Sequence, residues 1–141
     1  MTLPSGTALM ELSETDFAVA DPAADVRGRS VVDSSGEEMG KVDELLIDDT
    51  EARVRMLRIE HGGVLGIGAE HYLIPVDAVT GVTADEVSID RGRSKLTDVP
   101  GYDPDVSYEP AYYRNVYAWW NYSPYWTPDY SLPPFPHYPA A

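Results

Sequence analysis

The chain has 141 residues, with 10 lysines and arginines against 24 aspartates and glutamates, a net charge of −14 and a sequence pI near 4.3. This length suits one small domain with flanking segments and excludes a large multidomain enzyme. The acidity excludes a nucleic-acid surface and direct insertion into anionic lipid, and the absence of cysteine excludes disulfides and thiolate chemistry. A protein is the partner class that remains.

Three segments of unlike composition follow one another along the chain. Residues 1–25 carry five acids, no base and two prolines, and are predicted to form an extended arm with one short helix near residues 9–12. Residues 26–100 contain most of the valine, leucine and isoleucine and are predicted to be the folded domain. Residues 101–141 hold 13 of the 15 aromatic residues and 8 of the 12 prolines, which predicts a mostly irregular tail without a core of its own.

The middle segment consists of short apolar runs separated by turn residues. It contains no amphipathic run of the length that a crossover helix needs, so an all-β fold, a small antiparallel barrel, is predicted. Apolar residues occupy both faces of the third run, which predicts that the tail or a partner covers its outer face. The predicted strands span residues 26–33, 39–48, 53–60, 71–76 and 86–90.

One short helix is predicted in the tail, between Pro110 and Asn121. Proline suits the first turn of a helix, and apolar residues follow with helical spacing. The residues that recur at i, i+4, i+7 and i+8 are Tyr112, Val116, Trp119 and Trp120.

The aromatic tail predicts docking onto a protein surface, either the chain's own barrel or a partner. Tyrosine and tryptophan are enriched at binding hot spots. Stacking on nucleic acid is excluded because Arg114 is the one base in the tail. The predicted partner-binding residues are Tyr112, Tyr113, Val116, Trp119, Trp120, Tyr125 and Trp126.

Two Glu-His pairs bracket a glycine-rich loop at residues 62–68. A hairpin there would bring the pairs at 60–61 and 70–71 together as nitrogen and oxygen ligands for a divalent metal. Such pairs also arise by chance in an acidic protein, so no metal site is predicted, and His61 and His71 are the candidates if one exists. Nothing matches a nucleophile elbow or an ordered triad, so no catalytic residue is predicted.

The densest acidic patch lies at residues 43–51. Its ordinary explanation is a solvated hairpin end, and the alternative is a group of carboxylates that carries protons. The acids of this patch are Asp43, Glu44, Asp48, Asp49 and Glu51.

Residues 26–100 resemble the PRC-barrel domain, a small antiparallel β-barrel. The resemblance rests on GKVD at 40–43, RMLRIE at 55–60 and LIPVDAV at 73–79. It is closest to the cytoplasmic domain of the photosynthetic reaction-centre H subunit. By position, it implies that Asp48, Glu51 and Arg55 take part in proton transfer.

The resemblance implies a non-catalytic, H-like subunit that caps the quinone-reducing side of a bacterial photosynthetic reaction centre and assists proton delivery to the secondary quinone. The expected partners are the membrane-embedded subunits, which hold the bacteriochlorophyll and quinone, and a separate membrane-anchored H-like chain; no cofactor is expected on this chain. The expected location is peripheral, at the cytoplasmic face of the inner or photosynthetic membrane.

One departure from the H subunit favours an alternative. H subunits begin with a transmembrane helix, and no run of about 20 apolar residues occurs in this sequence. The alternative is a stand-alone PRC-barrel adaptor that binds a soluble protein or a ribosome or RNA-processing factor.

Overall fold

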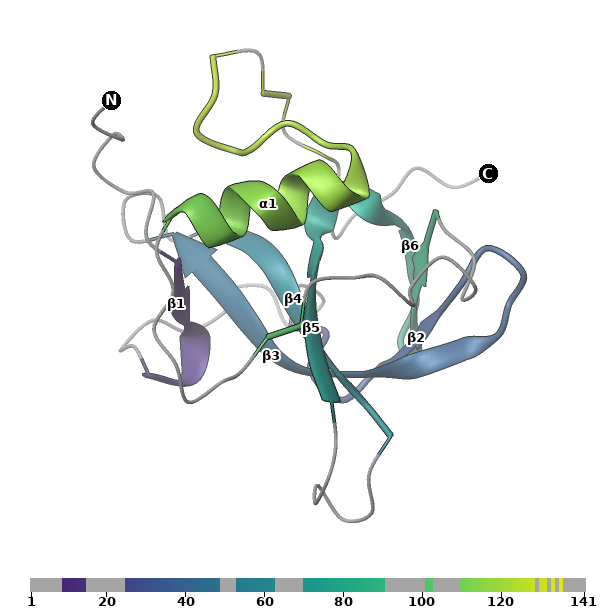
Figure 1. Cartoon of the computed structure of the whole chain (residues 1–141). Helices are drawn as coiled ribbons and strands as arrows, with labels where there is room; N and C mark the ends of the chain where they lie inside the picture. Colours follow the sequence, from purple (N-terminus) through teal and green to yellow (C-terminus); the bar gives the residue numbers. More distant parts are fainter. Residues whose placement is uncertain are drawn as a thin grey trace.

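An open β-sheet with one α-helix lying across it forms the structure (Figure 1). The computed structural model describes residues 9–14, 25–48, 53–62, 70–90, 101–102, 110–128, 130–131, 133 and 135. The strands are β1 (Leu9–Glu11), β2 (Ser30–Val32), β3 (Glu38–Asp48), β4 (Val54–His61), β5 (Glu70–Pro75), β6 (Val79–Val82) and β7 (Glu86–Ile89). The helices are η1 (Leu12–Glu14) and η3 (Val76–Ala78), both 3₁₀, and α1 (Pro110–Trp120).

The seven strands lie in the order β5-β4-β3-β2-β7-β6, and β1 pairs with β3 beside this path. The predicted all-β class and the single short helix are confirmed. The antiparallel prediction needs one correction, because β2 and β7 pair in parallel and the sheet does not close into a barrel. A parallel pair needs a long connection, and β3 to β6 provide it.

Besides β2, which covers only residues 30–32 of the strand expected at 26–33, β1 and β6 differ from the sequence prediction. A strand, β1, occupies residues 9–11, where a short helix was expected. Its pairing with the end of β3 supplies backbone hydrogen bonds, whereas an isolated helical turn is unstable in water. The strand β6 was missed because Gly81 interrupts its apolar pattern. A register shift between Val79 and Gly81 accommodates that glycine opposite β7.

The central strand β3 depends on one glycine where it passes β4. Gly40 has a φ of 148°, and a Cβ at this position would lie 2.4 Å from the carbonyl oxygen of Glu60. Two bulges in the β3–β4 register follow, between Val42 and Glu44 and between Leu46 and Ile47. Glycine therefore permits the close approach that aligns the two longest strands.

The helix α1 begins at Pro110, as predicted, and ends in a Schellman motif. Asn121 has a φ of 65°, and its N–H donates to the carbonyl of Ala118 at 3.1 Å. The N–H of Tyr122 donates to the carbonyl of Tyr117 at 3.0 Å. Asparagine tolerates the left-handed conformation well, so this residue stops the helix and directs the chain back over the sheet.

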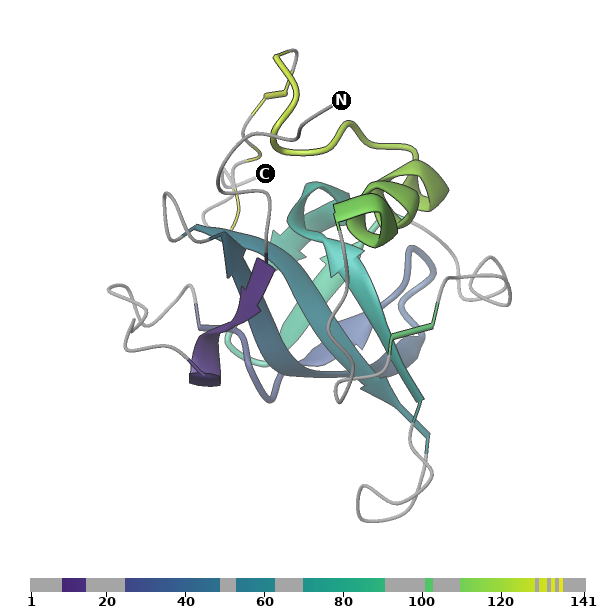
Figure 2. The ribbon, with the colours of Figure 1, turned by 60° about the vertical axis from the view of Figure 1, so that its left-hand side comes forward.

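The segment that follows the domain covers the free edge of β5 (Figures 1 and 2). The N–H of Tyr102 donates to the carbonyl of His71 at 2.9 Å, and the indole Nε1–H of Trp120 donates to the carbonyl of Leu73 at 3.1 Å. The hydroxyl of Tyr112 donates to the carbonyl of Gly101 at 2.6 Å. The first two bonds satisfy acceptors that the edge strand β5 would otherwise expose, and the third holds the covering segment together.

One hydrophobic core draws on all three predicted segments. Leu12 from the first segment and Val116 and Trp120 from the third are buried with the strands in a single cluster. Of the two docking surfaces that the sequence left open for the tail, the chain's own sheet is therefore occupied by α1. The domain boundaries at residues 25 and 100 stay a prediction.

Replacing Gly40 with alanine tests the close approach of β3 and β4. We expect Gly40→Ala to lower the free energy of unfolding by about 3 kcal/mol or more, because the added Cβ meets backbone. The control is Gly36→Ala, where φ is also positive at 88° but the space is open, with an expected loss of about 1 kcal/mol. Urea denaturation measures both, and equal losses would contradict the steric explanation.

Candidate functional site

A buried ion pair joins two of the three residues that the resemblance implies for proton transfer. The Nε of Arg55 lies 2.7 Å from Oδ2 of Asp48, and the side chains are 6% and 1% exposed. The strands β3 and β4 bring the pair together at the end of their ladder. The third residue, Glu51, lies outside the described residues.

Aromatic rings from the C-terminal segment cover this pair. The guanidinium carbon of Arg55 lies 4.4 Å from the ring centroid of Tyr125 and 5.9 Å from that of Tyr130. Trp126 contacts Tyr125 and Tyr117 edge to face, with centroids 5.0 and 6.0 Å apart. We call Tyr117, Tyr125, Trp126 and Tyr130 the aromatic cover; it adds cation–π attraction to an ion pair removed from water.

A second carboxylate, Asp77 of η3, lies beneath the aromatic cover. Burial raises its pKa, although the hydroxyl of Tyr130 and the charge of Arg55 oppose the rise. Burial and the charge of Asp77 in turn raise the pKa of Tyr130. The buried Oδ1 atom of Asp77 and the Tyr130 hydroxyl make no hydrogen bond of ordinary geometry with any described residue.

The two carboxylates differ in the proton chemistry that they support. Burial disfavours the charge on Arg55, but the hydrogen bond and charge of Asp48 outweigh it and raise the pKa of Arg55. That permanent cation is the fixed ion-pair partner of the Asp48 carboxylate. Asp77 therefore takes up a proton at higher pH than an ordinary aspartate does. Sequence reasoning missed Asp77, Tyr117 and Tyr130 because no local pattern links these positions to Arg55.

The predicted partner-binding residues divide into two groups. Tyr113, Val116 and Trp120 are buried against the chain's own sheet, at most 3% exposed, so they are tied up within this chain, and their role in binding a partner stays a prediction. The others pack beside the core and stay partly exposed, which leaves their predicted role open. These are Tyr112, Trp119, Tyr125 and Trp126.

The acidic patch is not the solvated hairpin end that the sequence suggested, as far as its described members show. Glu44 and Asp48 are buried, and Asp43 is partly buried. Each carboxylate has a donor: Ser13 donates to Glu44, Arg58 to Asp43 and Arg55 to Asp48. These donors come from the neighbouring strand β4 and from η1, so each carboxylate is paired across elements.

The predicted hairpin between the two Glu-His pairs is present, but it separates the histidines. Its register places Glu60 opposite His71 and His61 opposite Glu70. Successive residues point to opposite faces of a strand, so the cross-strand pair Glu60–His71 lies on one face of the hairpin and the cross-strand pair His61–Glu70 on the other. On its own face, His61 Nδ1 lies 2.8 Å from the carbonyl oxygen of Met39.

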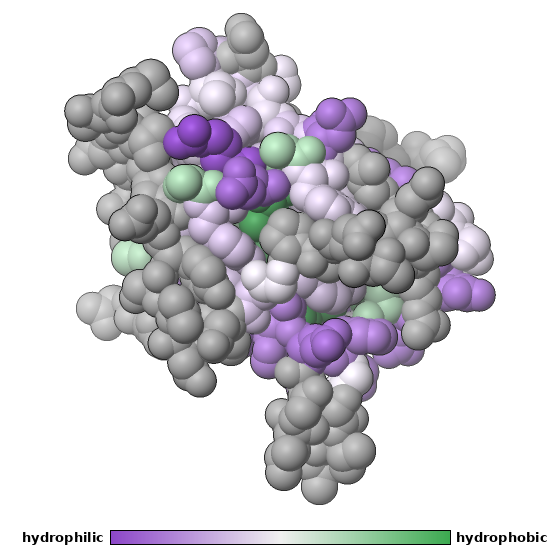
Figure 3. Space-filling model, in the orientation of Figure 1, coloured by the Kyte–Doolittle hydropathy of each residue, from purple (hydrophilic) through white to green (hydrophobic). Residues whose placement is uncertain are grey.

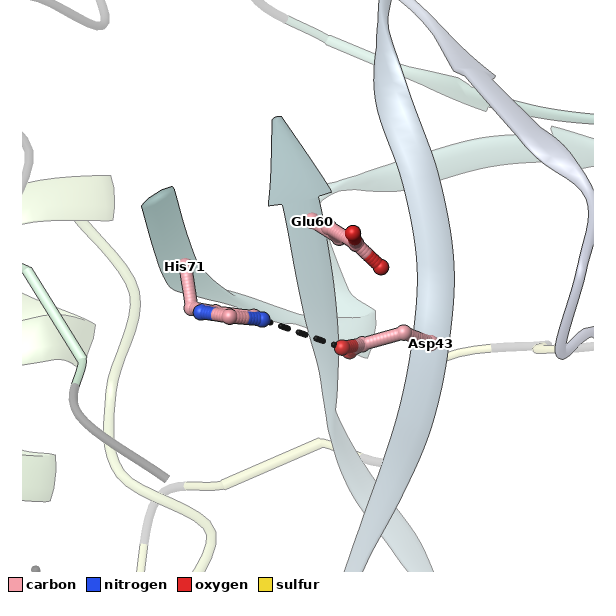
Figure 4. A group of neighbouring side chains, drawn as sticks. All are labelled: Asp43, Glu60 and His71. Atoms are coloured by element: carbon pink, nitrogen blue, oxygen red, sulfur yellow. Dashed lines mark ion pairs between the residues drawn. The ribbon is translucent and has the colours of Figure 1, made fainter. Parts of the chain in front are cut away.

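Asp43 of β3 lies beside Glu60 and His71, and the three residues form a cluster (Figure 4). His71 Nε2 lies 3.2 Å from Asp43 Oδ2, and one ligand atom from each of Asp43, Glu60 and His71 falls within 4.8 Å of the others. Arg58 holds Asp43 through Nε at 2.8 Å and Nη2 at 3.2 Å, and reaches Glu11 through Nη1 at 2.5 Å.

Removing the charge of Asp77 tests the environment beneath the aromatic cover. Because folding raises its pKa, ionised Asp77 destabilises the fold near neutral pH, and we expect Asp77→Asn to raise the melting temperature at pH 7. The gain should vanish as the pH falls below the folded-state pKa of Asp77, where the wild-type carboxyl is already protonated. Thermal unfolding across pH, with the exposed Asp85→Asn as control, measures this. If Asp77→Asn is no more stable than the wild type at pH 7, attraction to Arg55 outweighs burial.

The strands β2 to β7 fall within a span that matches a known domain family. Within the described part of the chain, no helix has both the length and the apolar character needed to cross a bilayer. A search of the curated proteins found no match. The family model of the PRC-barrel domain matches residues 19–101, a span that includes β2 to β7 and more than half of the sequence. The chain therefore belongs to the PRC-barrel domain family.

Proposed function

We propose that this chain is a non-catalytic interaction subunit that binds a larger protein through the outer side of its aromatic segment, residues 110–135. The observation that carries the proposal is the group of partly exposed aromatic side chains on a helix whose other side is anchored in the core. The PRC-barrel domain is a non-catalytic module, which agrees with a binding role.

The aromatic side chains are held in place before any partner arrives. Trp119 packs edge to face on buried Trp120, with centroids 4.9 Å apart and an interplanar angle of 73°. Tyr125 packs edge to face on Trp126 and lies over Arg55. Rigid aromatic anchors lose little conformational entropy on binding, so such a surface favours affinity.

The described part of this surface mixes hydrophilic and apolar residues. In Figure 3, the described side chains above and around α1 range from pale to purple, with small green areas between them. Tyrosine and tryptophan combine apolar rings with a polar tip, so they suit a surface that is exposed at one time and covered at another.

The resemblance to the reaction-centre H subunit supports a specific partner. In this form of the proposal, the chain caps the cytoplasmic, quinone-reducing side of a bacterial photosynthetic reaction centre and binds peripherally to its membrane-embedded subunits. Those subunits, with a membrane-anchored H-like chain, supply the attachment and the cofactors. Asp77, whose pKa is raised by burial, is the described carboxylate best suited to proton uptake there.

A second candidate is the stand-alone adaptor for a soluble protein or a ribosome or RNA-processing factor. The covered Asp48–Arg55 pair favours it: with side chains 1% and 6% exposed, the pair exchanges protons with a quinone site only if Tyr125 and Tyr130 move away. An adaptor needs no such movement.

Truncating Trp119 tests the binding surface. We expect Trp119→Ala to weaken binding to a detergent-solubilised reaction-centre core about 30-fold, the loss of about 2 kcal/mol typical of a hot-spot aromatic. Asn115→Ala, an exposed position on the same helix, is the control and should bind as wild type does. Surface plasmon resonance on the full-length chain measures the affinities.

The outcomes separate the levels of the proposal. Failure of the wild-type chain to bind the core would overturn the reaction-centre role. Wild-type binding with an unchanged affinity for Trp119→Ala would overturn the aromatic surface as the contact. Capture of a soluble partner that depends on Trp119 would support the adaptor.

A further inference from the structure

We infer that Asp43, Glu60 and His71 form a binding site for a divalent transition-metal ion of the zinc type. The site is distinct from the aromatic surface and does not depend on the proposed function. Its three side chains come from three neighbouring strands, β3, β4 and β5, and their ligand atoms lie within 4.8 Å of one another (Figure 4).

The spacing of the ligand atoms fits a tetrahedral ion. Two ligands that each lie about 2.0–2.1 Å from zinc at a tetrahedral angle are about 3.3 Å apart. His71 Nε2 and Asp43 Oδ2 are 3.2 Å apart, close to that edge length. The Glu60 carboxylate, within 4.8 Å of the other ligand atoms, closes on the ion by a rotamer adjustment.

The set of donors selects the class of metal. One imidazole nitrogen and two carboxylate oxygens suit zinc and neighbouring transition metals better than calcium or magnesium, which prefer oxygen alone. Three protein ligands leave a fourth position for water. All three ligands are partly exposed, and Glu60 also lines an open hollow of about 250 Å³ with Glu38, Gly40, Lys41 and Gly62.

Arg58 orients the site rather than blocking it. Its shorter contact, Nε to Oδ1 of Asp43 at 2.8 Å, leaves Oδ2 to face His71, and the 3.2 Å contact from Nη2 to Oδ2 is the one that the ion replaces. A donor behind a ligating carboxylate fixes its direction. Glu11, bound to the same guanidinium, offsets the positive charge of Arg58.

The strand alternation supplies a matched control. His61 is the neighbour of Glu60 in β4 but points to the opposite face, where its Nδ1 lies near the Met39 carbonyl. Its loss should leave the ion in place. The chain's third histidine, His137, provides a second control outside the described residues.

Isothermal titration of the full-length chain with ZnCl₂ at pH 7 tests the inference. We expect one ion per chain, an affinity at least about tenfold weaker in His71→Ala and in Glu60→Gln, and wild-type affinity in His61→Ala and His137→Ala. Zinc should raise the melting temperature of the wild type but not of His71→Ala.

Three results would overturn the site. They are no saturable binding by the wild type, wild-type affinity in His71→Ala, or an equal loss in His61→Ala. Circular dichroism of each variant without zinc establishes that it is folded. If His71→Ala does not fold, the zinc affinity of Glu60→Gln, which keeps the side-chain shape, tests the site instead.

Discussion

The free edge of β5 is the constraint on which the rest of the structure depends. The sheet is open, and the carbonyls of His71 and Leu73, two residues apart on β5, face away from β4. The backbone of Tyr102 and the indole of Trp120 donate to them. An uncovered edge invites pairing with other chains, so the aromatic segment completes the PRC sheet and prevents that pairing.

The docking of Trp120 on β5 determines where the aromatic cover lies over Arg55 and which way Trp119 faces. Once Trp120 is fixed on β5, the Schellman motif at Asn121 turns the chain back, and Tyr125 comes to lie over Arg55. A buried ion pair with Asp48 loses much of its hydration, and ring contact recovers part of that loss. The same geometry turns Trp119 outward, so the interaction surface is a by-product of closing the sheet edge.

Local pattern was sufficient for the elements with strong periodicity. The apolar spacing around Val116 predicted a helix between Pro110 and Asn121, and α1 spans Pro110–Trp120. Turn residues separated β3, β4, β5 and β7 correctly. Non-local pairing decided what the sequence could not: β1 exists because β3 is beside it, and β2 meets β7 in parallel across a long connection. A strand of three residues, such as β1, is too short for its alternation of apolar and polar residues to be recognised in the sequence.

The sites show the same division. Alternation along β4 and β5 alone separates His61 from His71, so that much could be predicted from the hairpin register. Asp43 could not, because it enters from β3, and the burial of Glu44 depended on a donor far away in sequence, Ser13. Position in a motif indicated Arg55 but not the rings that cover it.

Native-state hydrogen exchange tests most directly whether the aromatic segment is part of the fold. If α1 completes the sheet, the amides of residues 116–120 and those of β4 and β5 should exchange with the same opening free energy, close to that of global unfolding. Amides of α1 that exchange with a much lower free energy, while β4 and β5 stay protected, would contradict the account and return the segment to the status of an independent tail.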